Sequence, residues 1–141
     1  MSVAQAVQLH RPVEDINEDI AAIIRRFHPL AQSRHFFTYE VTPEGVVRFS
    51  GHIKSQVAQK ILLDSVARIP GVSGVDISDL HTEEELRIAV GRVLPPGVRA
   101  RVDYGDVILV GKLPPRHKVE TLVKKVASIP GVVHVQTALE D

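Results

Sequence analysis

The chain has 141 residues, of which 44% are hydrophobic and 24% charged, with 17 Lys and Arg balanced by 17 Asp and Glu. This composition is that of a folded domain and argues against a disordered chain, and the absence of cysteine excludes disulfides and thiolate chemistry. The zero net charge indicates neither nucleic acid nor membrane as a partner. Residues 1–9 lack the basic and apolar regions of a signal peptide, and no apolar run could span a bilayer, so we predict a cytoplasmic protein without a transmembrane segment.

The first part of the sequence predicts an arm, a helix and a loop. Residues 1–14 show no strong pattern and are predicted to form an N-terminal arm. Apolar residues then recur three and four positions apart, which predicts an amphipathic helix over 16–27 with Asp15 as its N-terminal cap. Pro29 is predicted to end this helix, because proline cannot continue one, and a loop follows over 30–36.

The next segment predicts a hairpin, a helix and a strand. Alternating apolar and polar residues indicate strands over 37–41 and 46–50, joined by a turn at 42–45. A helical stripe of apolar residues follows over 55–68, and a further strand is predicted over 72–77.

The second half repeats this order. Thr82 and Glu85 have the spacing of a capping box, so a helix is predicted to begin there and to end at Pro95. The remaining predicted elements are strands over 98–102 and 107–110, a helix that begins at Pro114-Pro115, and a strand over 132–137.

The two halves are related by an internal repeat with an offset of 60 residues, since Ile69-Pro70-Gly71-Val72 recurs as Ile129-Pro130-Gly131-Val132. The repeated structural residues are Gly51, Pro70 and Gly71 in the first copy and Gly111, Pro130 and Gly131 in the second. We therefore predict an α+β fold of two tandem α-β-β-α-β units, 15–79 and 80–141, each a small three-stranded mixed sheet packed by two helices. Units of this size are marginal alone, so we expect them to pack together or the chain to form a homo-oligomer.

The residues around the repeated corner resemble the BON domain, a family named after bacterial osmotically induced and nodulation proteins. The resemblance covers about residues 15–139 and rests on Val47-Arg48-Phe49-Ser50-Gly51 with 69–75, and on Val107-Ile108-Leu109-Val110-Gly111 with 129–135. It implies a non-catalytic module that binds phospholipid surfaces or mediates interactions, often in the bacterial envelope after a signal peptide. A few cytoplasmic members are implicated in sensing ions.

One basic segment is a candidate anion site. Between Arg87 and Lys125, Lys and Arg outnumber Asp and Glu by six. If a helix begins at Pro115, its N-terminus carries a positive partial charge and would attract anions. The predicted phosphate-binding residues are Lys112, Arg116 and Lys118, with Arg99 and Arg101 extending the patch. The alternative is a solvated basic turn paired with Asp106 or Glu120.

Adjacent aromatic residues provide a candidate interface. Phe36 and Phe37 come at the start of a predicted strand, where neighbouring side chains point to opposite faces. One of the two is therefore predicted to leave the local core and to pack on the second unit, on a partner subunit or on a membrane.

The sequence does not predict an enzyme. The seven histidines lack the spacing of a zinc site, and no serine lies in a nucleophile elbow, so no metal, cofactor or catalytic residue is predicted. The favoured function is a module that docks on anionic phospholipid or on a protein partner in a stress or envelope role. The alternatives are a cytoplasmic sensor of a small ion or anionic metabolite and, less favoured for want of stacking aromatics in the basic unit, an RNA-binding module.

Overall fold

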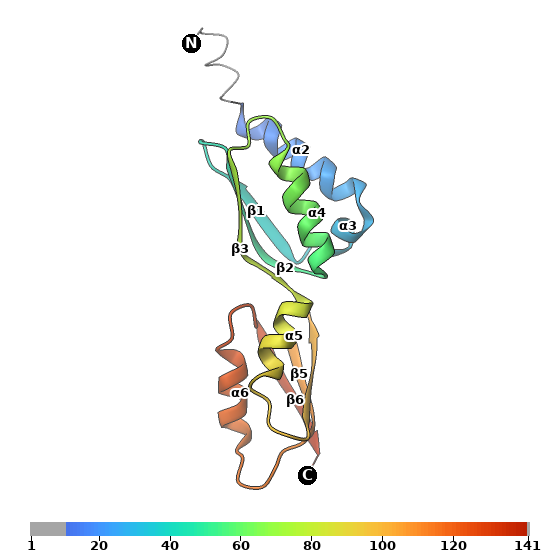
Figure 1. The fold of residues 1–141 in the computed structure, drawn as a ribbon, viewed down its shortest axis with the longest axis vertical. Coiled ribbons are helices and arrows are strands. Elements are labelled where there is room, and N and C mark those ends of the chain that lie inside the picture. Colours follow the sequence, from blue (N-terminus) through green and yellow to red (C-terminus); the bar gives the residue numbers. More distant parts are fainter. Residues whose placement is uncertain (1–10, 141) are drawn as a thin grey trace. The chain divides into compact units, whose positions relative to one another are not determined.

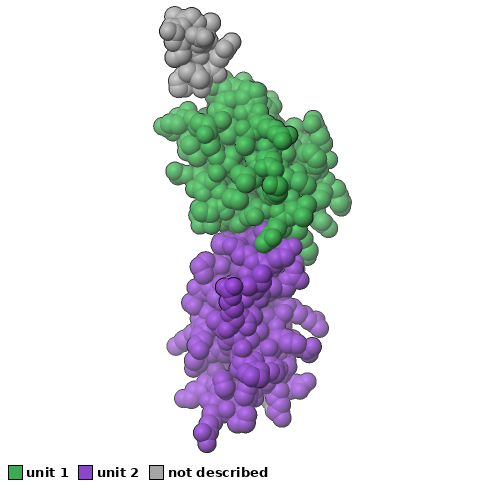
Figure 2. All heavy atoms as spheres, viewed as in Figure 1, with its two compact units in different colours: residues 1–80 green, residues 81–141 purple. Residues whose placement is uncertain are grey.

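The computed structural model describes residues 11–140, which form two compact units. Unit 1 extends to Leu80 and unit 2 begins at His81, and Figure 2 colours them separately. The predicted α+β class with two tandem units is confirmed. Residues 1–10 of the predicted N-terminal arm lie outside the described residues, whereas Val13 and Glu14 already belong to the first helix.

Unit 1 combines three described helices with a three-stranded sheet in the order β1-β2-β3 (Figure 1). Its elements are α2 (Val13–Arg26), α3 (His28–Ser33), β1 (Phe37–Val41), β2 (Val46–Ile53), α4 (Gln56–Ala67) and β3 (Gly74–Thr82). The prediction of two helices per unit therefore missed α3 in unit 1. The end of β3 continues into the first residues of unit 2.

Unit 2 has two described helices and a sheet in the order β4-β5-β6. Its elements are α5 (Glu83–Gly91), β4 (Val98–Asp103), β5 (Asp106–Lys112), α6 (Val119–Ala127) and β6 (His134–Glu140). Strands β4 and β5 are antiparallel and β5 and β6 are parallel, so the sheet is mixed as predicted.

The alternation of side chains along the strands gives each sheet one face that packs on helices. In β4, Val98 is buried and Val102 packs on the core, whereas Arg99 and Arg101 are exposed on the opposite face. Figure 1 shows the helices of each unit on one face of that unit's own sheet. Each unit is thus a two-layer structure with a solvent-facing sheet surface.

Each unit has its own hydrophobic core. The core of unit 1 is rich in large side chains from all three helices and the sheet, such as Ile20, Leu30, Phe49 and Leu62. The core of unit 2 is smaller and built mainly from valine and leucine, such as Val90, Leu109 and Val126. The helical spacing and the strand alternation of apolar residues in the sequence therefore predict the cores correctly.

The repeated Pro-Gly corner follows the last helix of each unit, α4 in unit 1 and α6 in unit 2. Gly71 and Gly131 adopt positive φ angles of 93° and 96°, a backbone conformation that favours glycine. A Cβ atom on Gly131 would lie 2.7 Å from Cγ of His81, so the side chain of His81 also requires a glycine here.

The first helix differs from its prediction at both ends. Helix α2 begins at Val13 with Pro12 at the N-cap position, so Asp15 lies inside the first turn and is not the cap. After Phe27, Pro29 lies in the first turn of the new helix α3, where proline is tolerated because its missing N–H has no intrahelical partner. The predicted loop is thus helical up to Ser33.

The capping box of α5 is confirmed. The Thr82 hydroxyl accepts a hydrogen bond from the Glu85 N–H at 3.2 Å, and the Glu85 carboxylate accepts one from the Thr82 N–H at 3.3 Å. The ring of His81 also lies 3.2 Å from the Glu85 carboxylate. These contacts satisfy N–H groups that would otherwise lack partners at the start of the helix.

The two adjacent phenylalanines separate as expected for the start of a strand. Phe37 is buried in the core, with its ring centroid 6.1 Å from that of Phe49. Phe36 is 46% exposed. An interface role for either residue stays a prediction.

Candidate functional site

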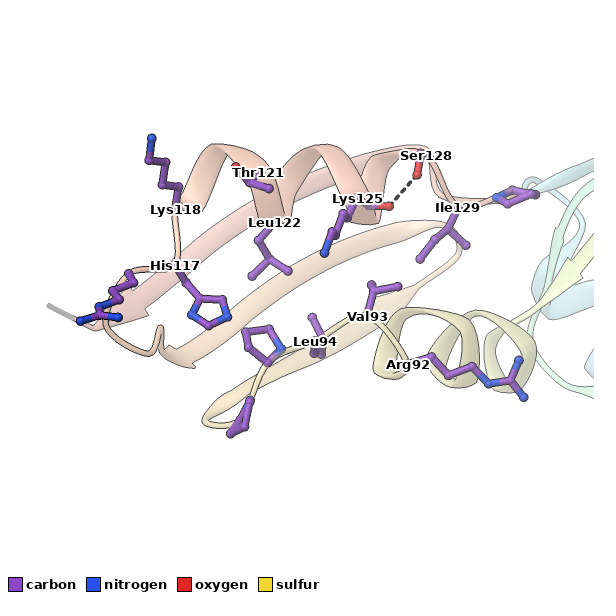
Figure 3. Close-up of a pocket in the computed structure, with 14 residues that line it drawn as sticks. Arg92, Val93, Leu94, His117, Lys118, Thr121, Leu122, Lys125, Ser128 and Ile129 are labelled. Carbon is purple, nitrogen blue, oxygen red and sulfur yellow. Dashed lines mark hydrogen bonds between the residues drawn. The ribbon is translucent and has the colours of Figure 1, made fainter.

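Unit 2 has a surface groove of about 850 Å³ beside α6 (Figure 3). Three segments line it: residues 92–96 after α5, residues 116–118 before α6, and one face of α6 with the corner that follows it, from Thr121 to Pro130. We refer to it as the unit 2 groove. Its size lies in the range of about 300–1,000 Å³ that is typical of binding pockets.

Helix α6 contributes a regular stripe to this groove. Thr121, Lys125 and Ser128 follow at intervals of four and three residues, so they lie on one helical face. The neighbouring Leu122 is largely buried and connects this stripe to the core. Figure 3 shows Leu122 and Lys125 directed toward the segment that carries Val93 and Leu94.

The groove combines an apolar floor with a cationic rim. Val93, Leu94 and Ile129 are partly buried apolar residues that pack on the core of unit 2. The cationic side chains of the lining are those of Arg92, Arg116, Lys118 and Lys125. Among the described residues that line the groove there is no carboxylate.

These cations have no ionic partner in the described part of the chain. Among residues 11–140, salt bridges join Arg11 to Asp19, Lys60 to Asp64 and His81 to Glu85, and no cation of the groove takes part in one. The predicted pairing of this basic turn with Asp106 or Glu120 is therefore absent among the described residues, whereas the turn itself is exposed to solvent. The positive charge of the rim is left for solvent or for a ligand.

The segment before α6 differs from its prediction. Helix α6 begins at Val119 with Lys118 at the N-cap position, so Arg116 and His117 lie in a loop and not in the first helical turn. Arg116 has a φ of 73°, a left-handed conformation that is uncommon for a residue with a side chain. The His117 N–H donates to the Pro114 carbonyl at 3.2 Å, which closes a turn after the two prolines.

The predicted anion-site residues fall into separate places. Arg116 and Lys118 both line the groove. Lys112 ends β5 outside it, and Arg99 and Arg101 lie on the exposed sheet face opposite the helices. Arg101 instead borders a small depression of about 170 Å³ together with Asp103 and Asp106.

Two cations of the groove were missed in the sequence. Arg92 follows the last residue of α5, and Lys125 lies in the last turn of α6. The spacing of Lys118, Thr121 and Lys125 was a usable signal, because residues three, four and seven apart share a helical face. No such signal was available for Arg92, since it lies far in sequence from α6 and meets the groove only in the folded chain.

In unit 1, burial raises the pKa of Tyr39, and hydrogen bonds from Ser78 lower the pKa of Asp76. Within residues 11–140 no group of three or more His, Asp and Glu side chains could hold a metal ion. None of the helices described is long and apolar enough to cross a membrane.

Comparisons with known proteins give fold likenesses only. No protein-family model matches the chain, and no curated protein matches it. One similar solved structure is the C-terminal domain of CdsD, a structural protein of the type III secretion system of Chlamydia trachomatis, with 15% identity, 89% of this chain and 96% of that chain covered, and a TM-score of 0.39. Another is the periplasmic domain of the type III secretion inner membrane protein PrgH from S. typhimurium, with 16% identity, coverages of 86% and 77%, and a TM-score of 0.31.

The predicted cytoplasmic location is not upheld. One of these fold likenesses is to a domain described as periplasmic, a description that belongs to that protein. That prediction depended on residues 1–9, and the start of the printed sequence does not determine the compartment. The resemblance to the BON domain stays a prediction.

Proposed function

We propose that this chain is a non-catalytic protein-interaction module and that the unit 2 groove is its binding surface. The observation that carries the proposal is the combination of an apolar floor with a cationic rim whose charges have no partner in the described chain. Apolar area supplies binding free energy, and unpaired charge supplies selection between partners.

A protein partner fits this surface better than the flat surface of a phospholipid bilayer. The basic residues of unit 2 are divided between the groove and the opposite sheet face, where Arg99 and Arg101 lie. A planar membrane can contact only one of these faces at a time, so the charges cannot act together on it. The apolar floor is recessed behind the rim, and a protruding polypeptide can reach it.

Site-specific photo-crosslinking tests this function. A photoreactive amino acid at Thr121, which is exposed and lines the groove, is expected to give a discrete adduct with a polypeptide in the native cells. The matched control is the same substitution at Gln136, which borders the depression on the opposite sheet face. The Thr121 adduct should disappear when Arg116→Glu and Lys125→Glu are combined.

Either of two results would overturn the proposal. One is an adduct with lipid and none with protein. The other is a protein adduct of equal yield at both positions, which would show general contact instead of a defined surface.

A further inference from the structure

The two units differ in the connection between the first helix and the first strand. In unit 1 this connection covers residues 27–36 and contains α3, whereas in unit 2 it covers only 92–97 and contains no helix. Leu30 of α3 is fully buried, with 0% exposure. Leu94, in the shorter connection, is only partly buried and lines the groove.

Helix α3 in unit 1 packs where the groove begins in unit 2. It contacts α4 and β2, and the Ser33 hydroxyl accepts a hydrogen bond from the Lys54 N–H at 3.2 Å, just before α4. With the 60-residue offset, Lys54 corresponds to Pro114 and Ala58 to Lys118, which lies in the groove lining. Ala58 is buried in unit 1, whereas Lys118 is exposed. The start of α6 thus lacks the neighbour that α3 provides at the start of α4 in unit 1.

We infer that the unit 2 groove binds an acidic amphipathic helix of a partner polypeptide, which lies along α6. This inference rests on the proposed function and names the class of partner. Apolar side chains of the bound helix contact Leu94 and Leu122, and its carboxylates face Arg116 and Lys125. An amphipathic helix in a hydrophobic groove is an established mode of recognition, read by apolar anchors at three- and four-residue spacing.

The charge and apolar floor of the groove select against other classes of ligand. A basic helix would place cations against the rim charges, which costs affinity through like-charge repulsion. A polyanion without apolar groups would leave the floor uncovered. Nucleic acid would also find few stacking partners, because the described lining contains no Phe, Tyr or Trp and His117 is its one aromatic ring.

Binding of synthetic peptides to the full chain tests the inference. The probe is a peptide of about four turns with leucine at i, i+3, i+4 and i+7 and glutamate on the other face. Two control peptides have the same composition in scrambled order, or lysine in place of glutamate. We expect only the first peptide to shift the backbone amide NMR signals of Leu94, Thr121 and Lys125, with an affinity that falls as salt is raised.

A charge-reversal pair tests which surface is used. Arg116→Glu with Lys125→Glu is expected to weaken binding of the acidic peptide by at least about tenfold, since both cations face its carboxylates. Arg99→Glu with Arg101→Glu makes the same charge change on the opposite sheet face and is expected to leave the affinity unchanged. Circular dichroism of both variants checks that the fold is retained.

Three outcomes would overturn the inference. Equal binding of the scrambled peptide would reduce the groove to a general anion surface, and absence of any peptide binding at millimolar concentration would exclude a helix. Phosphatidylglycerol vesicles that shift the same signals and displace the peptide would assign the groove to lipid. A protein adduct at Thr121 without peptide binding would leave the proposed function standing and remove only the acidic helix.

Discussion

Units 1 and 2 share a framework of strands and helices but differ in how completely their helices cover the sheet. Unit 1 has the longer first helix, α2, and adds α3 before its sheet begins. Unit 2 has the shorter α5 and goes directly from residues 92–97 into β4. The repeated sequence thus encodes the same architecture twice. The longer connection of unit 1 places α3 near the start of α4, whereas the shorter connection of unit 2 places no helix near the start of α6.

The different connections have different consequences: the one in unit 1 adds to the hydrophobic core, whereas the one in unit 2 leaves a surface open for binding. The place filled by α3 in unit 1 contributes a fully buried leucine to the core. The corresponding place in unit 2 holds partly exposed apolar side chains and cations without ionic partners. Such a surface is less favourable for the isolated chain and available for a ligand, since exposed apolar area is a typical mark of interaction sites.

Truncation of the two leucines would show the largest difference between the units. Leu30→Ala is expected to lower the free energy of unfolding of unit 1 by about 2–5 kcal/mol, because it leaves a cavity beneath α3. Leu94→Ala should cost unit 2 less than about 1 kcal/mol, since its side chain is only partly buried. Urea titration followed by NMR signals of each unit measures both values. Equal losses would mean that Leu94 is as well packed as Leu30.

Alanine substitutions of two glycines in unit 2 would show where the fold requires glycine and where it does not. Gly111 has a φ of 102°, and a Cβ atom there would lie 2.1 Å from the Gly97 carbonyl oxygen, so Gly111→Ala should destabilise unit 2 by more than about 1 kcal/mol. Gly91 ends α5 with open space around it, and Gly91→Ala should stabilise by about 0.4–1 kcal/mol. The same urea titration applies, and a neutral Gly111→Ala would contradict the close approach of the two segments.

The N-caps of α4 and α6, the last helices of the two units, would sharpen the comparison further. The Ser55 hydroxyl accepts a hydrogen bond from the Ala58 N–H at 3.1 Å at the start of α4, so Ser55→Ala should cost about 1 kcal/mol. Helix α6 has Lys118 at this position without a side-chain cap, so Lys118→Ser should stabilise unit 2 by up to about 1 kcal/mol. The same variant should bind the acidic peptide more weakly. A loss of stability on Lys118→Ser would show that this lysine has a structural role.

The smallest expected effect concerns the exposed sheet face of unit 1. The Ser78 hydroxyl and N–H both donate to the Asp76 carboxylate, at 2.6 and 2.9 Å, and lower its pKa. The stabilisation that this provides is present above the ordinary Asp pKa and is lost as the pH falls through the lowered value of the folded state. Ser78→Ala should raise the Asp76 pKa toward its ordinary value in an NMR carboxyl titration. Ser73→Ala, whose hydroxyl donates to the Glu44 carbonyl, serves as the control, and an unchanged Asp76 pKa in Ser78→Ala would contradict this account.

Local sequence chemistry determined most of the framework. The two periodicities of apolar residues, the capping box of Thr82 and the repeated Pro-Gly corners predicted the strands, the helices and their repetition. These features depend on interactions between residues close in the chain. For the same reason the pair Phe36 and Phe37 could be expected to separate between core and surface.

Only the tertiary structure decided what the sequence left ambiguous. A proline can end a helix or begin one, and packing against α4 and β2 accounts for the helix that follows Phe27. Nothing in the sequence separates the basic residues of unit 2 into groups. In the structure, Arg99 and Arg101 lie on the exposed face of the sheet. Arg92, Arg116 and Lys125 lie beside the groove on the helical side. The sequence alone thus determined that this protein has two related α+β units and a basic second half. The groove required the folded chain, because its residues come from segments whose proximity depends on contacts distant in sequence.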